Sequence, residues 1–380
     1  MTEKDNKIKW LWLTVKAGIT KAKIKKLLEV FNNVDNIFEG KREDYEKLDF
    51  LEENHINSLC NKNTLYCEKL LSAMEKGKMD IITYDMEEYP RNLTDLSSYP
   101  YVLYWKGNLI NLNNFNCISV VGSRTPCQYG KDTTQKICHN LSNKGFIIVS
   151  GMAGGIDSVA HTAAVESGMP TVAVLGTGAN IAYPRSNKKL YDKILEKGMI
   201  ISEYVPNTLP EPFRFPERNK IIASLSMGTV VTEAAIKSGS LITASIAKKL
   251  DREIFALPGN ITSKLSDGTN KLITEGAHII LKHSDIYDYY EEKIGKEKLF
   301  EKMYSVPKEE INETLSTSQP DFSTDNDEKI IIDALKEENL TIDGLSYKTG
   351  FSITDLSTKL LFMELNGTVT KQAGDFYSLT

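Results

Sequence analysis

Small and polar residues follow three short apolar runs in the middle of the chain, and these positions could bind phosphate groups. Gly122-Ser123-Arg124 follows the first run, Gly151-Met152-Ala153 the second and Gly176-Thr177-Gly178 the third. Glycine lets backbone amides approach an anion closely, and a helix N-terminus that follows adds partial positive charge. An arginine beside such a turn can bind two phosphate oxygens. A single loop of this kind indicates only a tight turn, but three together with Arg124 favour an anion site.

A second segment combines aromatic and basic residues in a pattern suited to a single nucleic-acid strand. It reads Pro210-Glu211-Pro212-Phe213-Arg214-Phe215-Pro216-Glu217-Arg218-Asn219-Lys220. The bases of a single strand can stack on rings while cations neutralise its phosphates. In an ordinary packing role, Phe213 and Phe215 would be core or hinge residues. Ser238-Gly239-Ser240 and Thr243 add hydroxyl groups at the start of another predicted helix.

Several well-known catalytic and metal-binding patterns are missing from the sequence. There is no GxxxxGK[ST] loop, no GxSxG elbow and no cluster of metal ligands, and the dinucleotide pattern GxGxxG is incomplete at Gly176. His161 stands four residues after Asp157 on a predicted helix, where the two could form a stabilising pair or a functional dyad. The stabilising pair is the simpler interpretation.

The elements that must position these residues are predicted from alternating apolar runs and amphipathic stretches. The runs cover 118–122, 146–151, 171–176, 199–204, 229–233, 253–259 and 277–281, and the helical patterns between them cover 131–144, 156–167, 188–197, 219–225 and 241–250. Continuous Val/Ile runs separated by helices predict a mostly parallel sheet covered on both faces. We therefore expect an α/β, doubly wound, Rossmann-like domain with its ligand at the carboxyl ends of the strands.

Smaller segments flank this domain. Residues 1–80 predict a helical module of the helix-hairpin-helix or SAM-like type, with a structural role because the hairpin Ala17-Gly18-Ile19-Thr20 lacks a second glycine. Residues 81–116 predict a connector rich in Tyr and Pro, 117–285 the sheet domain, and 286–325 an acidic, Ser/Thr-containing linker. Residues 326–380 predict three helices and a hairpin, a winged helix whose third helix, 353–365, carries Lys359 as its one base.

The composition is that of a globular protein, and its charge is uneven. The chain has 380 residues, 41% hydrophobic and 26% charged, with a net charge of -5. Residues 117–281 carry 18 Lys and Arg against 13 Asp and Glu, whereas residues 321–380 carry 5 against 11. This favours the centre for a polyanionic ligand and makes the C-terminal module a poor nucleic-acid binder. The sequence shows no membrane span or signal peptide and no CxxC pair among its five cysteines, so we expect a cytoplasmic protein with reduced thiols.

Taken in order, the motifs resemble the DprA/Smf family of DNA-processing proteins. The resemblance runs from about residue 80 to 285 and rests on Gly122-Ser123-Arg124, on 150–161, on Tyr183-Pro184, on 215–219, on 233–243, and on Leu257-Pro258-Gly259 with Ser266-Asp267-Gly268. It implies a non-catalytic protein without cofactor or metal that binds single-stranded DNA and loads the recombinase RecA during natural transformation. It also implies an extended Rossmann-like fold and a homodimer.

The resemblance further implies which residues contact DNA. These are Gly122, Ser123, Arg124, Gly151, Met152, Ala153, Phe213, Phe215, Arg218, Asn219, Lys220, Lys237, Ser238, Gly239, Ser240 and Thr243. The chain departs from the family at Lys220, where a second arginine is common, and at Asn180, near which an acid is common. Lysine keeps the charge but loses the bidentate geometry. For the dimer interface we expect Leu272, Ile273 and Ile279, which flank Gly276 near the last predicted strand together with Ile280.

Two other functions remain open at this point. Gly228-Thr229 followed by Glu233-Ala234 is also similar to nucleoside-monophosphate phosphoribohydrolases, in which a glutamate assists cleavage of a glycosidic bond. Those enzymes usually have a PGGxGT run, and here the stretch is Ser224-Leu225-Ser226-Met227-Gly228-Thr229. The other possibility is a structural adaptor with a vestigial pocket. Release of free base from nucleoside monophosphates would identify the enzyme.

Overall fold

The computed structural model describes residues 2–15, 19–304 and 324–351, and beyond them 356, 359–360, 363–364, 368–372 and 376–379. The chain divides into two compact units, residues 1–305 and 306–380. The second unit is described by itself below. Among the described residues, no helix has the length and apolar character needed to cross a bilayer.

The larger unit is organised around a nine-stranded sheet with the order β1-β2-β6-β5-β4-β3-β7-β8-β9. The strands are β1 (Met79–Thr83), β2 (Val102–Gly107), β3 (Cys117–Val121), β4 (Ile147–Ser150), β5 (Thr171–Leu175), β6 (Met199–Ser202), β7 (Gly228–Val231), β8 (Glu253–Ala256) and β9 (His278–Ile279). Strands β3 to β9 pair in parallel, and β1 and β2 add an antiparallel edge beside β6. The seven parallel strands are those that the apolar runs predict.

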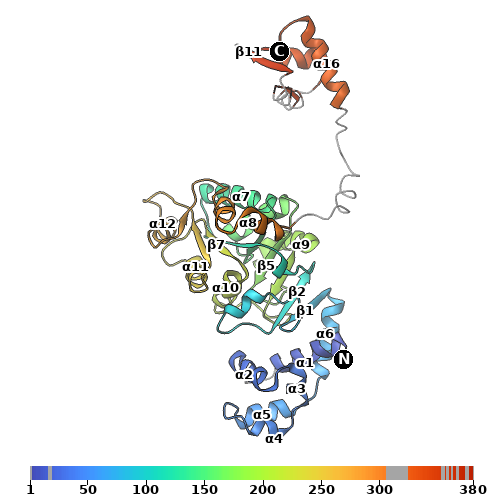
Figure 1. Cartoon of the computed structure of the whole chain (residues 1–380), viewed down its shortest axis with the longest axis vertical. Helices are drawn as coiled ribbons and strands as arrows, with labels where there is room; N and C mark the ends of the chain where they lie inside the picture. The colour runs from blue at the N-terminus through green and yellow to red at the C-terminus, as the bar shows by residue number, and fades with distance from the viewer. Residues whose placement is uncertain are drawn as a thin grey trace. The chain divides into compact units, whose positions relative to one another are not determined.

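Helices cover both faces of the sheet, as the strand composition requires (Figure 1). One face carries α7 (Gln128–Asn143), α8 (Ile156–Glu166), α9 (Lys188–Lys197), α13 (Asp285–Ile294) and α14 (Lys296–Glu301), and the other carries α10 (Arg214–Leu225) and α11 (Gly239–Lys249). In β3, Ile118 and Val120 pack under the first group and Val121 under the second. A strand buried on both faces needs such a continuous apolar run. The doubly wound α/β prediction is thus confirmed.

The N-terminal helices pack onto the β1–β2 edge of this unit. They are α1 (Glu3–Val15), α2 (Lys21–Phe31), α3 (Val34–Glu39), α4 (Arg42–Glu46), α5 (Glu53–Cys60) and α6 (Leu65–Lys76). Lys7 Nζ lies 2.6 Å from Asp80 Oδ2 on β1, and the rings of Trp10 and Tyr101 stack with centroids 5.8 Å apart. The sequence does not predict β1 or β2. β1 falls where the predicted helical module meets the predicted connector, and the aromatic residues in and before β2 suggest a connector, whereas Tyr101 and Tyr104 are buried.

Residues 285–301 also differ from the expectation of a linker. They form α13 and α14, and Ile286, Tyr290 and Leu299 are buried against the sheet. The acidic residues of this segment lie on the side away from the sheet. Its acidic composition therefore predicts a linker and hides the apolar face that packs on the sheet. Most of the remaining expected linker, residues 305–323, lies outside the described residues.

The second unit contains α16 (Thr324–Glu337), α17 (Ile342–Thr349) and an antiparallel sheet of β10 (Leu340–Thr341), β12 (Phe376–Leu379) and β11 (Val369–Gln372). Its core includes Ile331, Leu335, Leu345, Leu356 and Leu360. This arrangement of helices and a terminal hairpin agrees with the predicted winged helix. Much of the third helix expected at 353–365 lies outside the described residues.

Candidate functional site

The order of the strands places a crevice between the carboxyl ends of β3 and β7. The chain leaves β3 toward β4 on one side and later returns to β7 on the other, so the helices that follow β3 and β7 lie on opposite faces. Ligands of doubly wound sheets bind at such a reversal point. Gly122, Ser123 and Arg124 follow β3 directly, and 237–243 come after β7, so two of the predicted segments follow the carboxyl ends of these adjacent strands.

Arg124, Phe215 and Tyr183 form a stack at this edge. The Arg124 guanidinium carbon lies 5.7 Å from the centroid of the Phe215 ring, and the Tyr183 ring stacks on Phe215 with centroids 5.6 Å apart at 27°. Arg124 is exposed and forms no ion pair with any described residue, and Tyr183 is 40% exposed. A cation next to accessible rings can bind a phosphate and an adjoining base together.

The loop after β4 is organised around Asp157 rather than open to an anion. The backbone N–H groups of Gly151 and Ala153 donate to Asp157 Oδ2, at 3.1 and 3.3 Å, and the side chain of Met152 is fully buried. These three residues were expected to supply amides to DNA. The structure corrects that role for Gly151 and Ala153, because Asp157 already accepts both of their N–H groups, and it places the Met152 side chain in the core.

Arg218 is likewise an internal residue. It is 4% exposed, and its guanidinium donates to the carbonyl oxygens of Gly151 and of Val174, the latter at 2.6 Å. Burial lowers the pKa of Arg218 to about 10, so the side chain stays charged at neutral pH. Burial also raises the pKa of Asp157, against the opposing charge of Arg218. Arg218 therefore holds the ends of β4 and β5 together, and the expectation that it contacts DNA directly needs correction.

Gly151 is a glycine because Arg218 occupies the space beside it. A Cβ at position 151 would lie 2.5 Å from the guanidinium carbon. Any side chain there would displace the arginine. The two positions thus form one structural unit, although the sequence motifs containing them are far apart in the chain.

The remaining residues of the aromatic and basic segment lie at the start of α10. Phe213 is 60% exposed, and the Arg214 guanidinium lies over its ring at 5.2 Å and over the Tyr204 ring at 5.3 Å. Lys220 pairs with Glu217 at 2.7 Å on the helix surface. Phe213 therefore offers a free ring face, while Lys220 has a competing anion.

The β7–α11 turn lies beside this segment. The Asn219 side chain donates to the Gly239 carbonyl at 3.4 Å, which joins α10 to α11. Ser238 caps α11, with its hydroxyl 2.6 Å from that of Ser240. Thr243 is fully buried, whereas Lys237 is exposed. Lys237 is thus the member of this turn best placed to meet a phosphate, and Thr243 has a packing role.

Glu233, the residue that the hydrolase alternative requires, is engaged elsewhere. It is 3% exposed and accepts hydrogen bonds from the Cys127 N–H and thiol, at 3.0 and 2.7 Å. A Cβ on Gly130 would lie 2.4 Å from its carboxyl carbon, so α7 packs tightly on this group. Glu233 anchors the loop between Arg124 and α7. A buried carboxylate used in this way argues against a role in glycosidic cleavage.

His161 does not pair with Asp157. Its Nδ1 lies 2.8 Å from Thr171 Oγ1, in the fully buried interior. Burial lowers the pKa of His161 to about 3, so the imidazole is neutral. Both the stabilising pair and the dyad are therefore wrong for these two residues.

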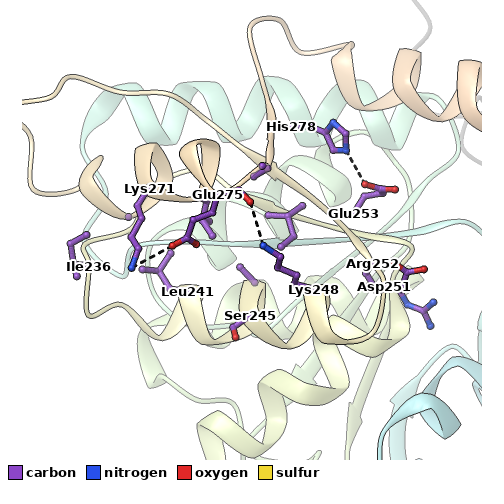
Figure 2. A pocket seen from close by; sticks show the side chains of 16 residues that line it. Ile236, Leu241, Ser245, Lys248, Asp251, Arg252, Glu253, Lys271, Glu275 and His278 are labelled. Atoms are coloured by element: carbon purple, nitrogen blue, oxygen red, sulfur yellow. Dashed lines mark hydrogen bonds and ion pairs between the residues drawn. The ribbon is translucent and has the colours of Figure 1, made fainter.

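The residues predicted for a dimer lie beside a groove of about 470 Å³ between α11 and α12 (Asp267–Thr274), shown in Figure 2. Leu272 lines it and is partly buried, Ile273 is half-buried, and Ile279 is 44% exposed. Ile280, part of the same apolar pattern, is 2% exposed and belongs to the core. Charged side chains at the rim include Lys271 and Glu275, which pair with each other along α12 at 3.6 Å.

Sequence reasoning missed Tyr183 and Arg214 as site residues. Tyr183 occurs in the Tyr183-Pro184 motif and Arg214 lies inside the aromatic and basic segment, so both carried a signal. No cluster of three or more possible metal ligands occurs in the part of the chain that the structure describes.

The fold and this edge define a Rossmann-like binding protein that presents a cation and stacked rings at the reversal point of its sheet. Comparison with known proteins identifies the family: the chain belongs to the DNA recombination-mediator protein A family, whose model matches residues 80–291. The DprA winged helix domain model matches residues 316–375. The family description names no catalysed reaction.

Individual relatives agree. DNA processing protein DprA of Streptococcus pneumoniae is 37% identical, covering 73% of this chain and 95% of that protein, and Protein Smf of Synechocystis is 32% identical over 97% of each. The solved S. pneumoniae structure superimposes with a TM-score of 0.66 at 35% identity, covering 74% of this chain and 97% of that one. The Helicobacter pylori DNA processing protein A, described for its single-stranded DNA binding mode, gives 0.52 at 29%, covering 56% and 96%.

Proposed function

We propose that this protein binds single-stranded DNA along the carboxyl edge of its sheet, as a non-catalytic partner in DNA processing in the cytoplasm. The stack of Arg124, Phe215 and Tyr183 is the observation that carries the proposal. A strand can stack bases on the exposed rings of Tyr183 and Phe213, beside Phe215, while Arg124 and Lys237 neutralise its phosphates. The single-stranded DNA binding described for the H. pylori protein supports this function.

The corrected site changes which residues should touch DNA. We assign direct contact to Gly122, Ser123, Arg124, Phe213, Phe215, Lys237 and the nearby hydroxyl of Ser238. Ser240 is 6% exposed and supports the edge. We assign support of the edge to Gly151, Met152, Ala153, Arg218 and Thr243. Asn219, Gly239 and Lys220 lie between the two groups, and Lys220 must leave Glu217 before it binds a phosphate.

A gel-shift experiment with single- and double-stranded oligonucleotides tests the proposal. Single-stranded DNA should bind more tightly than double-stranded DNA. The logarithm of its binding constant should fall against the logarithm of the salt concentration, with a slope of about -0.7 for each phosphate neutralised. Incubation with nucleoside monophosphates should release no free base. Affinity that does not change with salt, or release of base, would contradict the assignment.

The finer role is loading of RecA by a homodimer during natural transformation. We infer it from the family. The test is RecA filament formation on single-stranded DNA already covered by a single-strand-binding protein. Addition of this protein should accelerate filament formation, and no acceleration at DNA-saturating concentrations would contradict the loading role.

A further inference from the structure

A second pocket, of about 450 Å³, lies at the amino ends of the parallel strands. Cys117, which begins β3, is part of its lining, as are Met227 and Arg252, which directly precede β7 and β8. Arg124 follows the carboxyl end of β3. Because β3, β7 and β8 are parallel, this pocket and the proposed DNA-binding edge are at opposite ends of the strands.

The pocket carries positive charge that the surrounding protein compensates only in part. Its basic side chains are Arg91, Arg252 and Lys302, and no carboxylate is among its lining residues in the described part of the chain. The Arg91 guanidinium donates to the backbone carbonyls of Tyr84 and Met86, both at 2.8 Å. Lys302 Nζ donates to the Asn113 carbonyl at 3.2 Å. A neutral carbonyl orients a cation without cancelling its charge.

Arg252 has an unused donor. One of its terminal nitrogens pairs with Asp95, which holds the side chain in place. Its Nε is buried and has no hydrogen-bond partner among the described residues. A buried N–H of a cation without an acceptor is unfavourable, and a small shift of the side chain toward an anion in the pocket would supply one.

The rest of the lining combines the polar side chains Asn92, Asn113 and Asn116 with an apolar part that can contact the body of an organic ligand. Leu112, Phe115, Leu225 and Met227 provide it, and Cys117 beside them is neutral because burial raises the pKa of its thiol to about 12. A pocket of this size falls within the range of about 300 to 1,000 Å³ typical of small-molecule sites.

We propose that this pocket binds a phosphate-bearing anion of nucleotide size, with phosphate oxygens on Arg252, Lys302 and Arg91 and the base against the apolar residues. Since the pocket and the DNA-binding edge are at opposite ends of the strands, both ligands can be bound at once. The site does not depend on the proposed function.

Calorimetric titration of the full chain with adenosine triphosphate and with pyrophosphate tests the assignment. Adenosine triphosphate should bind saturably, and more tightly than pyrophosphate because its base adds apolar contact. Lys302→Ala should weaken this binding about tenfold, since a charge-assisted contact is lost. Lys298→Ala is the matched control, an exposed lysine one turn earlier on α14. Arg252→Gln is the second variant.

Single-stranded DNA affinity of the same variants separates this site from the proposed function. Lys302→Ala should leave DNA binding unchanged, whether or not the DNA-binding edge is assigned correctly. The proposal is overturned if neither anion binds, or if Lys302→Ala and Lys298→Ala lose the same affinity. Equal binding of both anions would overturn the base contact. If Arg252→Gln lowers the melting temperature, its loss of affinity could reflect a destabilised fold. The comparison of Lys302→Ala with Lys298→Ala then decides the outcome, because both lysines are exposed.

Discussion

The Arg124 guanidinium lies 5.7 Å from the ring centroid of Phe215, between the end of β3 and the start of α10. Arg124 has no ion-pair partner among the described residues, whereas the half-buried Phe215 ring is held between Arg124 and the stacked Tyr183 ring. The ring holds the cation at the edge of the sheet before any ligand arrives. Binding therefore requires little rearrangement of this pair.

Arg124→Glu should weaken single-stranded DNA binding at least tenfold, because it removes an attractive charge and adds a repulsive one at the crevice. Fluorescence anisotropy at fixed salt measures the loss. Lys136→Glu makes the same charge change on the exposed surface of α7 and should have a much smaller effect. Equal losses would mean that net charge acts without a defined site.

Arg218→Met should destabilise the fold by about 3 kcal/mol, because removal of one partner leaves the buried Asp157 carboxylate without its compensating charge. Urea unfolding at neutral pH measures the change. The double variant with Asp157→Asn should lose less free energy of unfolding than the two single variants lose in sum. Unchanged stability together with lost DNA binding would restore Arg218 as a direct contact.

Ile279→Asp should give a folded monomer if the groove of Figure 2 belongs to the dimer interface, since this side chain is 44% exposed. Light scattering gives the mass, and circular dichroism confirms folding. Ile261→Asp, at a side chain that is 88% exposed, is the control and should remain dimeric. A dimeric Ile279→Asp variant would place the interface elsewhere.

Removal of residues 321–380 should leave single-stranded DNA affinity equal or higher, because that segment carries 5 Lys and Arg against 11 Asp and Glu. The comparison is made by anisotropy at two salt concentrations. A tenfold weaker affinity in a folded, dimeric protein corresponds to about 1.4 kcal/mol and would make the winged helix a DNA-binding element.

Glu253→Gln should reduce the sensitivity of the fold to acid. Burial alone would raise the pKa of Glu253, but hydrogen bonds from Lys293, Tyr289 and His278 outweigh it and lower the pKa to about 2. A pKa below the ordinary 4.5 means that the carboxylate stabilises the fold above pH 4.5 and loses this effect as the pH falls toward 2. The free energy of unfolding measured in urea should therefore fall less steeply in the variant than in the wild type between these pH values. The exposed Glu292→Gln should match the wild type.

The parallel strands and their helices were predictable because each has a continuous apolar run or a helical period of its own. Strands β1 and β2 were not, since they pair antiparallel at an edge and the aromatic residues of β2 equally suit a connector. The sequence also could not show which site residues are exposed to a ligand and which are internal supports. Arg124 follows a strand end and Arg218 lies in the aromatic and basic segment, and their types alone suit both for DNA. Arg124 is exposed, whereas Arg218 is 4% exposed because it packs beside Gly151 and donates to its carbonyl.

The last strand, β9, has two residues, and this has a consequence for aggregation. An edge strand recruits other chains when it offers a long row of unpaired backbone N–H and C=O groups. His278 and Ile279 offer almost none, and the opposite edge is flanked by the N-terminal helices that pack on β1. Many copies bound to one DNA strand would lie close together. Their sheets would still not join into a fibre, because neither edge offers a free row of backbone groups.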